Sequence, residues 1–490
     1  MLLTQIVNNI KAKMLCDIKG CIDGIDAVGV TSNSRSVEPG YIFVAVKGAT
    51  IDGHRFISDA IKKEASAIVI DSDFTKQESF KIPSIAVQDT REALVVTLNQ
   101  FLGNPPERIF AVTGTNGKTT ITHILWHIFT ESGEKTGIIG TLGFAYEDGI
   151  HQNLPVTTPG AEMLWKILAN MKKRGITNVA LEASSHGLDQ KRVWGVDFTA
   201  AIFSNFSQDH LDYHGDMVNY LRSKCMLFEE CSQDCVSVVN LDDPASSKII
   251  EVNHGILLTY AIENESADIV AHPGYMDFSG SRFGLKTPWG NFDIETNLPG
   301  RFNVYNVMAS TAAAMATGYQ PEEVIKALDN FEGIKGRFQL IKMGQPFEVV
   351  IDYAHTPDAL RNLIDTVREI TEENVIVVFG AGGDRDHNKR PIMGGIATEL
   401  ADFAVITSDN PRSEDPERII DMIESGVTRE NYNRNSDRKE AIIEAIIRAK
   451  PGDTVLIAGK GHEDYQIFAN ETIHFDDAET AKEAIMQICK

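Results

Sequence analysis

Positive charge is scarce in this 490-residue sequence, and its scarcity excludes a class of partners. There are 46 Lys and Arg residues against 69 Asp and Glu residues, which gives a formal net charge of −23. Proteins that bind nucleic acids or anionic membranes build their affinity from clustered Lys and Arg side chains. We therefore expect no nucleic-acid partner. Any anionic ligand has to be bound locally, by loop amides, metal ions and a few basic side chains.

Cysteines and long apolar runs are also scarce. Six cysteines are too few for a disulfide scaffold. Cys225, Cys231 and Cys235 lie close together but have neither a CxxC pair nor an adjacent His, so buried or idle thiols are expected rather than a zinc site. The first residues do not resemble a signal peptide, and no apolar run approaches the roughly 18 residues of a membrane span. We expect a cytoplasmic protein without membrane insertion that acts as a monomer.

Two segments of the chain are candidate domain boundaries. One is the Gly-Asn-Pro-Pro segment at 103–106, and the other is the Gly-rich turn at 331–337. They predict domains of residues 1–105, 106–335 and 336–490, whose lengths are typical of domains.

Within each domain, short β-branched runs alternate with longer helical stretches, which predicts an α/β protein with mostly parallel sheets. The expected strands are 109–112, 178–182, 200–203, 374–379, 403–407 and 454–458. The expected helices are 119–132, 391–400 and 437–449. Ligands are then expected at the carboxyl ends of the strands.

The strongest motif is Ala-Val-Thr-Gly-Thr-Asn-Gly-Lys-Thr-Thr at 111–120, between a predicted strand and a predicted helix. Glycines let backbone N–H groups surround phosphate oxygens, Lys118 can reach the terminal phosphates, and Thr119 can bind Mg²⁺. Val112 replaces the first Gly of the general GxxxxGK[ST] pattern. A chance GK[ST] is common, but the strand-loop-helix context favours ATP. The expected ATP-binding residues here are Gly114, Thr115, Asn116, Gly117, Lys118, Thr119 and Thr120.

This compact loop resembles that of the Mur ligases of peptidoglycan synthesis and of their relatives, the folylpolyglutamate synthetases. Segments 181–188, 205–212, 299–306 and 352–357 also resemble Mur ligase blocks in the expected order, so the resemblance spans essentially the whole chain. It implies that ATP activates a carboxylate as an acyl phosphate and that an amide is formed. It also implies an N-terminal domain for a UDP-sugar, a P-loop-type central domain for ATP and a Rossmann-like C-terminal domain for an amino acid.

The resemblance implies metal-binding and catalytic roles for several polar residues. Glu182 ends a predicted strand and His210 follows another, so both can face the phosphate loop, although a strand-end histidine is more often a packed or capping residue. Lys224 lies in an amphipathic stretch where a lysine is usually solvated. The resemblance implies that Thr119, Glu182, His210 and Lys224 bind Mg²⁺, with Lys224 carbamylated to N6-carboxylysine. The implied catalytic residues are Lys118, Lys224 and His210.

The amides of Asn303 and Asn306 lie three residues apart at the start of a predicted helix. A helix cap is the ordinary explanation, and it fits Asn303 well. The resemblance implies that Asn306 meets the adenine. It also implies that Arg337 and Asp352 contact the phosphates and the ribose.

The acceptor substrate implied by the resemblance is UDP-N-acetylmuramoyl-L-alanyl-D-glutamate. Val156 stands before a Thr pair where members that add the third peptide residue often have Asn. The residues that resemble the muramoyl-peptide contacts are Ser34, Thr157, Thr158, Ser184, Gln190 and Arg192.

The segment that we expect to bind the amine donor is Ser-Asp-Asn-Pro-Arg at 408–412. Alone, this segment is most simply a turn after a strand, but an Arg at that place can bind a carboxylate through two hydrogen bonds. Asp-Asn-Pro-Arg resembles the signature of the members that add meso-diaminopimelate, and Glu463 would hold its distal ammonium. The implied pocket comprises Arg385, Asp409, Asn410, Pro411, Arg412, Gly459 and Glu463.

Three alternatives stay open. A folylpolyglutamate synthetase shares the loop and the chemistry but needs neither the Ser34-Arg35 segment nor the Asp-Asn-Pro-Arg block. A lysine-adding muramoyl ligase is closer and differs at the position of Arg412. A P-loop GTPase or motor would carry a DxxG segment after the second strand and an NKxD motif, and neither is found.

Overall fold

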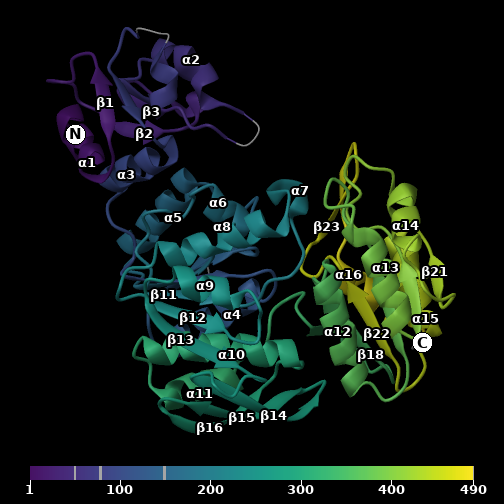
Figure 1. Cartoon of the computed structure of the whole chain (residues 1–490). Coiled ribbons are helices and arrows are strands. Elements are labelled where there is room, and N and C mark those ends of the chain that lie inside the picture. The colour runs from purple at the N-terminus through teal and green to yellow at the C-terminus, as the bar shows by residue number, and fades with distance from the viewer. Residues whose placement is uncertain (49–50, 77–79, 147–150, 489–490) are drawn as a thin grey trace.

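The computed structural model describes residues 1–48, 51–76, 80–146 and 151–488. Three α/β units follow one another along the chain, each with its own sheet (Figure 1). Parallel strands alternate with helices in all three, which confirms the predicted fold class. The sheets take their strands from residues 16–87, 108–296 and 339–458 in turn. The domain boundaries at 105 and 335 stay predictions.

The N-terminal sheet has the strand order β1-β5-β4-β3-β2, and only the pairing of β1 with β5 is antiparallel. Its strands are β1 (Cys16–Lys19), β2 (Gly29–Thr31), β3 (Tyr41–Val44), β4 (Ala67–Asp71) and β5 (Ser84–Val87). Its helices are α1 (Leu3–Lys13), α2 (Ile57–Lys62) and α3 (Thr90–Leu102), with short 3-10 turns η1 (Ser34–Ser36), η2 (Gly53–Phe56) and η3 (Ser72–Lys76). Helices α1 and α3 cover one face of the sheet and α2 the other.

The central sheet has the order β16-β15-β14-β13-β12-β11-β6-β10-β7-β8-β9. Neighbours from β14 to β7 are parallel, and both edges are antiparallel. The strands are β6 (Arg108–Thr113), β7 (Thr136–Gly140), β8 (Gly143–Tyr146), β9 (His151–Gln152), β10 (Asn178–Glu182), β11 (Ala200–Phe203), β12 (Val236–Asn240), β13 (Ile256–Ala261), β14 (Ile269–Asp277), β15 (Gly280–Thr287) and β16 (Gly290–Thr296). The helices are α4 (Lys118–Glu131), α5 (Ala161–Lys173), α6 (Ser185–Asp189), α7 (Leu211–His214), α8 (Met217–Glu229), α9 (Ser246–Val252), α10 (Arg301–Ala316) and α11 (Pro321–Asp329).

The central sheet has a core on each face. Successive side chains of a strand point to opposite faces, so Ile109 and Ala111 of β6 enter the core beneath α5, whereas Phe110 and Val112 enter the core beneath α4 and α10. Both faces of β6 are therefore buried, as a near-continuous apolar strand requires. This burial fixes the end of β6, and with it the start of the phosphate loop.

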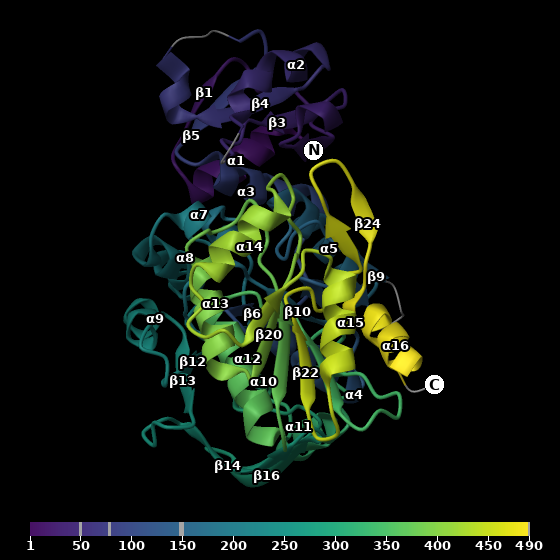
Figure 2. The same cartoon turned by 90° about the vertical axis from the view of Figure 1, so that its right-hand side faces the viewer.

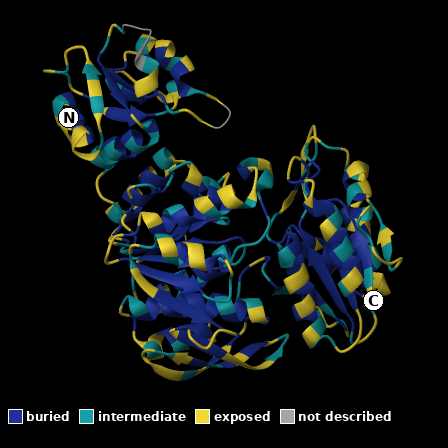
Figure 3. Cartoon of the chain, in the orientation of Figure 1, coloured by how far each residue is buried: buried dark blue, intermediate teal, exposed yellow. Residues whose placement is uncertain are grey.

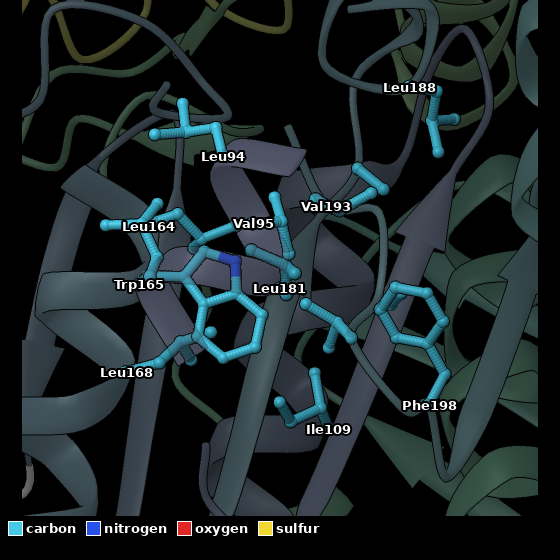
Figure 4. Packing of buried hydrophobic residues seen from close by; sticks show 14 of the residues in the cluster. Leu94, Val95, Ile109, Leu164, Trp165, Leu168, Leu181, Leu188, Val193 and Phe198 are labelled. Atoms are coloured by element: carbon cyan, nitrogen blue, oxygen red, sulfur yellow. The ribbon is translucent and has the colours of Figure 1, made fainter. Parts of the chain in front are cut away.

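A shared core joins the N-terminal and central units. Trp165 of α5 is 1% exposed and packs with Leu164 and Leu181 of the central unit and with Leu94 and Val95 of α3 (Figure 4). Helix α3 also packs on α5. The N-terminal unit therefore rests on the central one through apolar contacts (Figure 1).

The C-terminal sheet has the order β17-β18-β22-β19-β20-β21, parallel except for β17. Its strands are β17 (Gln339–Leu340), β18 (Glu348–Asp352), β19 (Val375–Phe379), β20 (Phe403–Ile406), β21 (Tyr432–Arg434) and β22 (Thr454–Ala458), with a separate pair β23 (Tyr465–Ile467) and β24 (Thr472–His474). Its helices are α12 (Pro357–Ile370), α13 (Lys389–Leu400), α14 (Pro416–Glu424), α15 (Arg438–Arg448) and α16 (Asp477–Ile488). Helices α12, α13 and α14 cover one face, and α15 and α16 the other (Figure 2).

Burial follows this layered plan, with buried strands between helices that turn their exposed residues outward (Figure 3). The strands predicted at 178–182, 200–203 and 454–458 are confirmed residue for residue, and the other predicted strands end within one residue of the observed ones. Helix α13 begins two residues before the predicted Pro391, because proline is tolerated in a first helical turn, where backbone N–H groups need no partner within the helix. The capping role for Asn303 is wrong, since Gly300 caps α10 and Asn303 lies inside its first turn.

Cys225, Cys231 and Cys235 are buried, and Cys489 lies outside the described residues. Within the described ranges, no helix combines the length and the apolar character that a membrane crossing requires.

Candidate active site

The predicted phosphate loop lies between β6 and α4, at the carboxyl edge of the central sheet. Gly117 caps α4 with φ 85°, and Gly114 has φ 146°. A side chain at Gly114 would collide with Ser204, and one at Gly117 would collide with the amide of Asn306. Glycine is therefore required at both positions for conformation and for space.

Lys118 is folded back over this loop. Its Nζ donates to the carbonyl oxygens of Gly114 and Thr115, at 2.9 Å each. Burial lowers the pKa of Lys118, although Glu182 and Asp209 act in the opposite direction. Among the described residues, no carboxylate lies in direct contact with Nζ of Lys118, and an anionic ligand would stabilise its charge.

A cavity of about 720 Å³ opens above the loop, between the central and C-terminal units. All of the residues predicted for ATP and for the metal line it, although they come from distant segments. They are Gly114, Thr115, Asn116, Gly117, Lys118, Thr119, Thr120, Glu182, His210, Lys224, Asn306, Arg337 and Asp352. Thr157 and Ser184 of the predicted muramoyl site line the same cavity.

Glu182, the last residue of β10, is fully buried and is oriented by a residue that sequence reasoning missed. Thr141 donates to its carboxylate from the backbone N to Oε1 and from Oγ1 to Oε2, at 2.9 Å each. The Thr141 hydroxyl also lies 3.1 Å from the hydroxyl of Thr157. Thr141 therefore connects the predicted metal ligand to the predicted muramoyl site.

Burial disfavours the charged forms of His210 and Lys224. His210 has φ 55°, and burial lowers its pKa to about 3 despite the neighbouring Asp209. Lys224 is 1% exposed, its Nζ lies 4.3 Å from the centre of the Tyr220 ring, and burial lowers its pKa well below the ordinary value. A neutral imidazole and a neutral amine each have a lone pair available for reaction or coordination.

The C-terminal unit contributes Arg337 and Asp352 to the cavity. Arg337 donates from Nη2 to the hydroxyl of Thr119 at 3.1 Å and stacks over Tyr353 at 4.3 Å. Asp352 accepts the backbone N–H groups of Phe338 and Ala354, at 2.7 Å each. Burial raises the pKa of Asp352, with Arg337 opposing the rise. Arg337 thus connects the two units directly at the phosphate loop.

Asn303 and Asn306 form a pair on the other wall. The Nδ2 of Asn306 donates to Oδ1 of Asn303 at 3.0 Å, and Asn303 donates to the carbonyl of Pro299 at 2.7 Å. Both side chains are buried. Asn303 therefore orients the amide of Asn306, a role that the sequence alone does not reveal.

Further contacts that sequence reasoning missed join the central and C-terminal units beside the cavity. Asn116 of the phosphate loop donates to Asp358 at 3.0 Å. Asp209 is 5% exposed, and its carboxylate lies 3.8 Å from Nζ of Lys389 and 3.9 Å from Nε2 of His355. Burial alone would raise the pKa of Asp209, but these neighbours and His210 hold it well below its usual range. These contacts hold the two units together beside the cavity.

The other residues predicted for the muramoyl peptide are partly brought together. Arg192 donates from Nη2 to Oε1 of Gln190 at 2.8 Å and from Nη1 to the carbonyl of Thr158. The hydroxyls of Thr158 and Ser184 lie 3.0 Å apart. Ser34 lies in η1 of the N-terminal unit and does not line the cavity. Val156 is 45% exposed.

The residues predicted for the amine donor meet at the carboxyl ends of β19, β20 and β22, in a group separate from the cavity lining. Arg412 donates from Nη1 to the carbonyl of Gly383 at 2.8 Å, and a Cβ at Gly382 would touch both Arg412 and Arg385. Asn410 donates to Glu463 at 2.7 Å. The loops that carry the two arginines and Glu463 therefore meet at this edge. Pro411 and Gly459 belong to the same two loops.

The metal site is incomplete in protein ligands alone. Among the described residues, no three His, Cys, Asp or Glu side chains are grouped so as to hold a metal ion. Thr119, Glu182, His210 and Lys224 nevertheless line one cavity. Mg²⁺ prefers oxygen ligands and often takes several of them from phosphates and water. The site therefore fits Mg²⁺ only together with a nucleotide.

Comparisons with known proteins agree with this geometry. Residues 26–102 match the family model described as the Mur ligase family, catalytic domain, residues 112–314 match the Mur ligase middle domain, and residues 336–461 match the Mur ligase, glutamate ligase domain. The chain is 43% identical over 472 residues to the UDP-N-acetylmuramoyl-L-alanyl-D-glutamate--2,6-diaminopimelate ligase of Geobacillus thermodenitrificans, covering 94% of this chain and 95% of the relative. The enzyme of the same name from Bacillus velezensis is 42% identical over 475 residues, 95% of each chain.

Solved structures share the fold. A UDP-N-acetylmuramoyl-L-alanyl-D-glutamate--2,6-diaminopimelate ligase superposes with a TM-score of 0.70 at 34% identity, covering 97% of this chain and 98% of the other. A folylpolyglutamate synthase of Mycobacterium tuberculosis, complexed with ADP and AMPPCP, has a TM-score of 0.63 at 17% identity, covering 76% of this chain and 92% of the other.

A phosphate loop, a strand-end carboxylate and a cavity between two α/β units define an ATP-dependent ligase. The matched domains span most of the chain in order. The chain belongs to the Mur ligase family.

Proposed function

We propose that this ligase joins meso-2,6-diaminopimelate to the D-glutamate of UDP-N-acetylmuramoyl-L-alanyl-D-glutamate, with conversion of ATP to ADP and phosphate, as a cytoplasmic step of peptidoglycan precursor synthesis. The observation that carries the proposal is the edge of the C-terminal sheet, where the loops that carry Arg385 and Arg412 meet those that carry Asp409 and Glu463. The curated relatives at about 42% identity carry the name of this activity.

The amine-donor pocket matches the charges of diaminopimelate. The D-centre of this molecule carries a carboxylate and an ammonium, which lysine-like donors do not present together. A guanidinium group can bind the carboxylate through two hydrogen bonds. Glu463, whose side chain is 12% exposed, offers a carboxylate for the ammonium. The pocket therefore favours diaminopimelate over L-lysine.

The reaction starts with the D-glutamyl γ-carboxylate, which is a poor electrophile. Its oxygen attacks the γ-phosphorus of ATP, the bond to the β-phosphate oxygen breaks, and ADP leaves. Lys118 and Arg337 supply positive charge on two sides of the transferring group, and the glycine loop supplies backbone N–H groups. Partial burial of both cations in the cavity strengthens these interactions.

The resulting acyl phosphate is then attacked by the amino group at the L-centre of diaminopimelate. A tetrahedral intermediate forms, the carbon–oxygen bond to phosphate breaks, and the amine loses a proton, so amide and phosphate are released. No side-chain nucleophile is required. Positioning of two substrates by separate units supplies much of the rate acceleration.

Mg²⁺ would be held by Thr119, Glu182, His210 and Lys224 together with phosphate oxygens. It would neutralise charge on the phosphates during transfer. His210 offers a neutral nitrogen and Glu182 a carboxylate fixed by Thr141. Lys224 fits as a carbamate, because CO₂ adds to the neutral form of an amine, and burial favours that form.

We expect activity to depend on CO₂ through Lys224. Protein freed of bicarbonate should lose most of its kcat, and added bicarbonate should restore it. Lys224→Ala should lower kcat about 100-fold without restoration, since an anionic oxygen pair would be missing. The measurement is phosphate release with and without bicarbonate. Lys248→Ala, at an exposed lysine paired with Glu251, serves as the control. Full activity in bicarbonate-free protein would contradict the carbamate.

The choice of amine is tested by phosphate release from ATP with the muramoyl dipeptide substrate. We expect meso-diaminopimelate to be preferred over L-lysine by about 1000-fold in kcat/KM, since a site built for a charged group rejects an analogue that lacks it. Release with lysine alone would identify the lysine-adding alternative. Release only with a folate and glutamate would identify a folylpolyglutamate synthetase.

A further inference from the structure

A buried lysine that the proposed mechanism does not use lies behind the amine-donor pocket. Lys460 follows β22 and has no exposed surface. Its Nζ donates to Oε2 of Glu463 at 3.1 Å and to Oδ1 of Asn410 at 3.2 Å. A lysine is almost never fully buried unless its charge is paired, because removing the ammonium from water is costly. The burial of Lys460 therefore indicates that its charge is paired within the protein.

The three side chains form a closed triangle. Asn410 donates from Nδ2 to the same Oε2 of Glu463 at 2.7 Å, while its Oδ1 accepts both Lys460 and the backbone N–H of Ile467, the latter at 3.0 Å. Oε2 of Glu463 is thus bound twice. Within the described part of the chain, Oε1 makes no hydrogen bond, and the side chain is 12% exposed. The triangle leaves one carboxylate oxygen of Glu463 available to a ligand.

The charged groups that surround the triangle on its buried side include more carboxylates than cations. Three carboxylates, of Asp409, Glu463 and Asp477, accompany two buried cations, Lys460 and Arg438. Arg438 donates two hydrogen bonds of 2.8 Å to the carboxylate of Asp477. Lys460 and Arg438 together hold the pKa of Asp409 low against the opposing effect of its burial. Among these five groups the carboxylates outnumber the cations by one, and Oε1 of Glu463 can accept an ammonium.

We propose that Lys460 is a positioning residue for the amine donor: it clamps the Asp409–Arg412 turn to the loop carrying Glu463 and fixes Glu463 to receive the ammonium at the D-centre. This inference rests on the proposed function for the identity of the donor. Lys460 itself does not contact the substrate. It acts through Asn410 and Glu463, which come from the loops that follow β20 and β22.

The test compares two amine donors in Lys460→Met and Lys460→Gln. One donor is meso-diaminopimelate, and the other is L-2-aminopimelate, which keeps the distal carboxylate but lacks the distal amino group. We expect KM for diaminopimelate to rise about 10- to 100-fold, the loss typical of hydrogen bonds to charged groups. KM for aminopimelate and for ATP should change less than threefold. Lys439→Met, at an exposed lysine of the same unit, is the control.

An equal rise for both donors would show a merely structural role and overturn the proposal, as would unchanged KM values. If Lys460→Met does not fold, as judged by thermal melting, Lys460→Gln carries the test: its amide can still donate to Glu463 but carries no charge, so a smaller rise in KM, still confined to diaminopimelate, is expected. Hydrogen exchange of the full-length protein gives a second readout that needs no turnover. Faster exchange in 409–412 and 459–467 of the variant, with β19 unchanged, is expected, and unchanged exchange in both loops would overturn the clamp. Absence of amide product in the unsubstituted protein would instead refute the proposed function.

Discussion

Lys118→Met is expected to lower kcat/KM for ATP by about 1000-fold or more, the largest effect of any single change in the central unit. The Nζ of Lys118 is held over the phosphate loop by two carbonyl oxygens, so its charge is preorganised where phosphate charge accumulates. Methionine keeps the length of the side chain and removes the charge. Phosphate release and binding of a fluorescent ATP analogue are the measurements.

The same residue gives a pH dependence with a defined sign. The pKa of Lys118 is lowered from 10.5, chiefly by burial, so the free protein loses this proton at a lower pH than an exposed lysine would. ATP binds the protonated form better. Affinity for ATP is therefore expected to fall as pH rises through the lowered pKa, and Lys118→Met should show no such fall.

Lys248→Met provides the control for charge removal at an exposed position. Both variants should melt within a few degrees of the unsubstituted protein. If Lys118→Met keeps ATP affinity and turnover within threefold, the loop does not bind the nucleotide through this residue. A loss of turnover with unchanged affinity would limit the role of Lys118 to the phosphoryl transfer step.

The phosphate loop could be predicted from sequence because its determinants are contiguous. A strand buried on both faces, two glycines and a helix start occupy 108–118 without a gap. The same holds for the strand ends that carry Glu182 and the turn at 409–412. Local patterns thus identify which residues end at a sheet edge.

Thr141 and Asn303 could not be predicted, for a physical reason. Thr141 meets Glu182 because β7 lies beside β10 in the sheet, and strand order is set by tertiary packing rather than by local pattern. Asn303 looks like a helix cap, but Gly300 caps the start of α10, and the amide of Asn303 orients Asn306 instead. Contacts between units, such as that of Asn116 with Asp358, depend on how whole domains meet.

Arg412→Ala is expected to raise KM for meso-diaminopimelate about 100- to 1000-fold and to leave KM for ATP unchanged. The reason is loss of a two-fold hydrogen-bonded contact with a carboxylate, which a site built for that group cannot replace. Arg412 is held in a left-handed conformation with φ 53°, by a hydrogen bond of 3.0 Å from its backbone N to the carbonyl of Ile467. The guanidinium is therefore fixed by the fold.

Arg412→Ala should also lose most of its preference for meso-diaminopimelate over L-lysine. Lysine has no distal carboxylate, so removing Arg412 costs it nothing and relieves repulsion between two cations. The ratio of kcat/KM for the two donors, measured by phosphate release, is expected to fall about 100-fold or more. Arg412→Lys should recover part of the loss, since it restores the charge but not the planar pair of donors.

Arg429→Ala, at an exposed arginine of the same unit, controls for a general loss of positive charge. Arg385 is exposed and lies on the other side of Gly382, so it can compensate in part. The double variant Arg385→Ala with Arg412→Ala therefore isolates the carboxylate site: if diaminopimelate is still preferred over lysine when both guanidinium groups are gone, its distal carboxylate is bound elsewhere. The two arginines are expected to bind the distal carboxylate of the donor, and Glu463 its distal ammonium. Aminopimelate keeps the distal carboxylate but lacks the distal amino group. The arginine variants should therefore raise KM for aminopimelate, whereas the Lys460 variants should not.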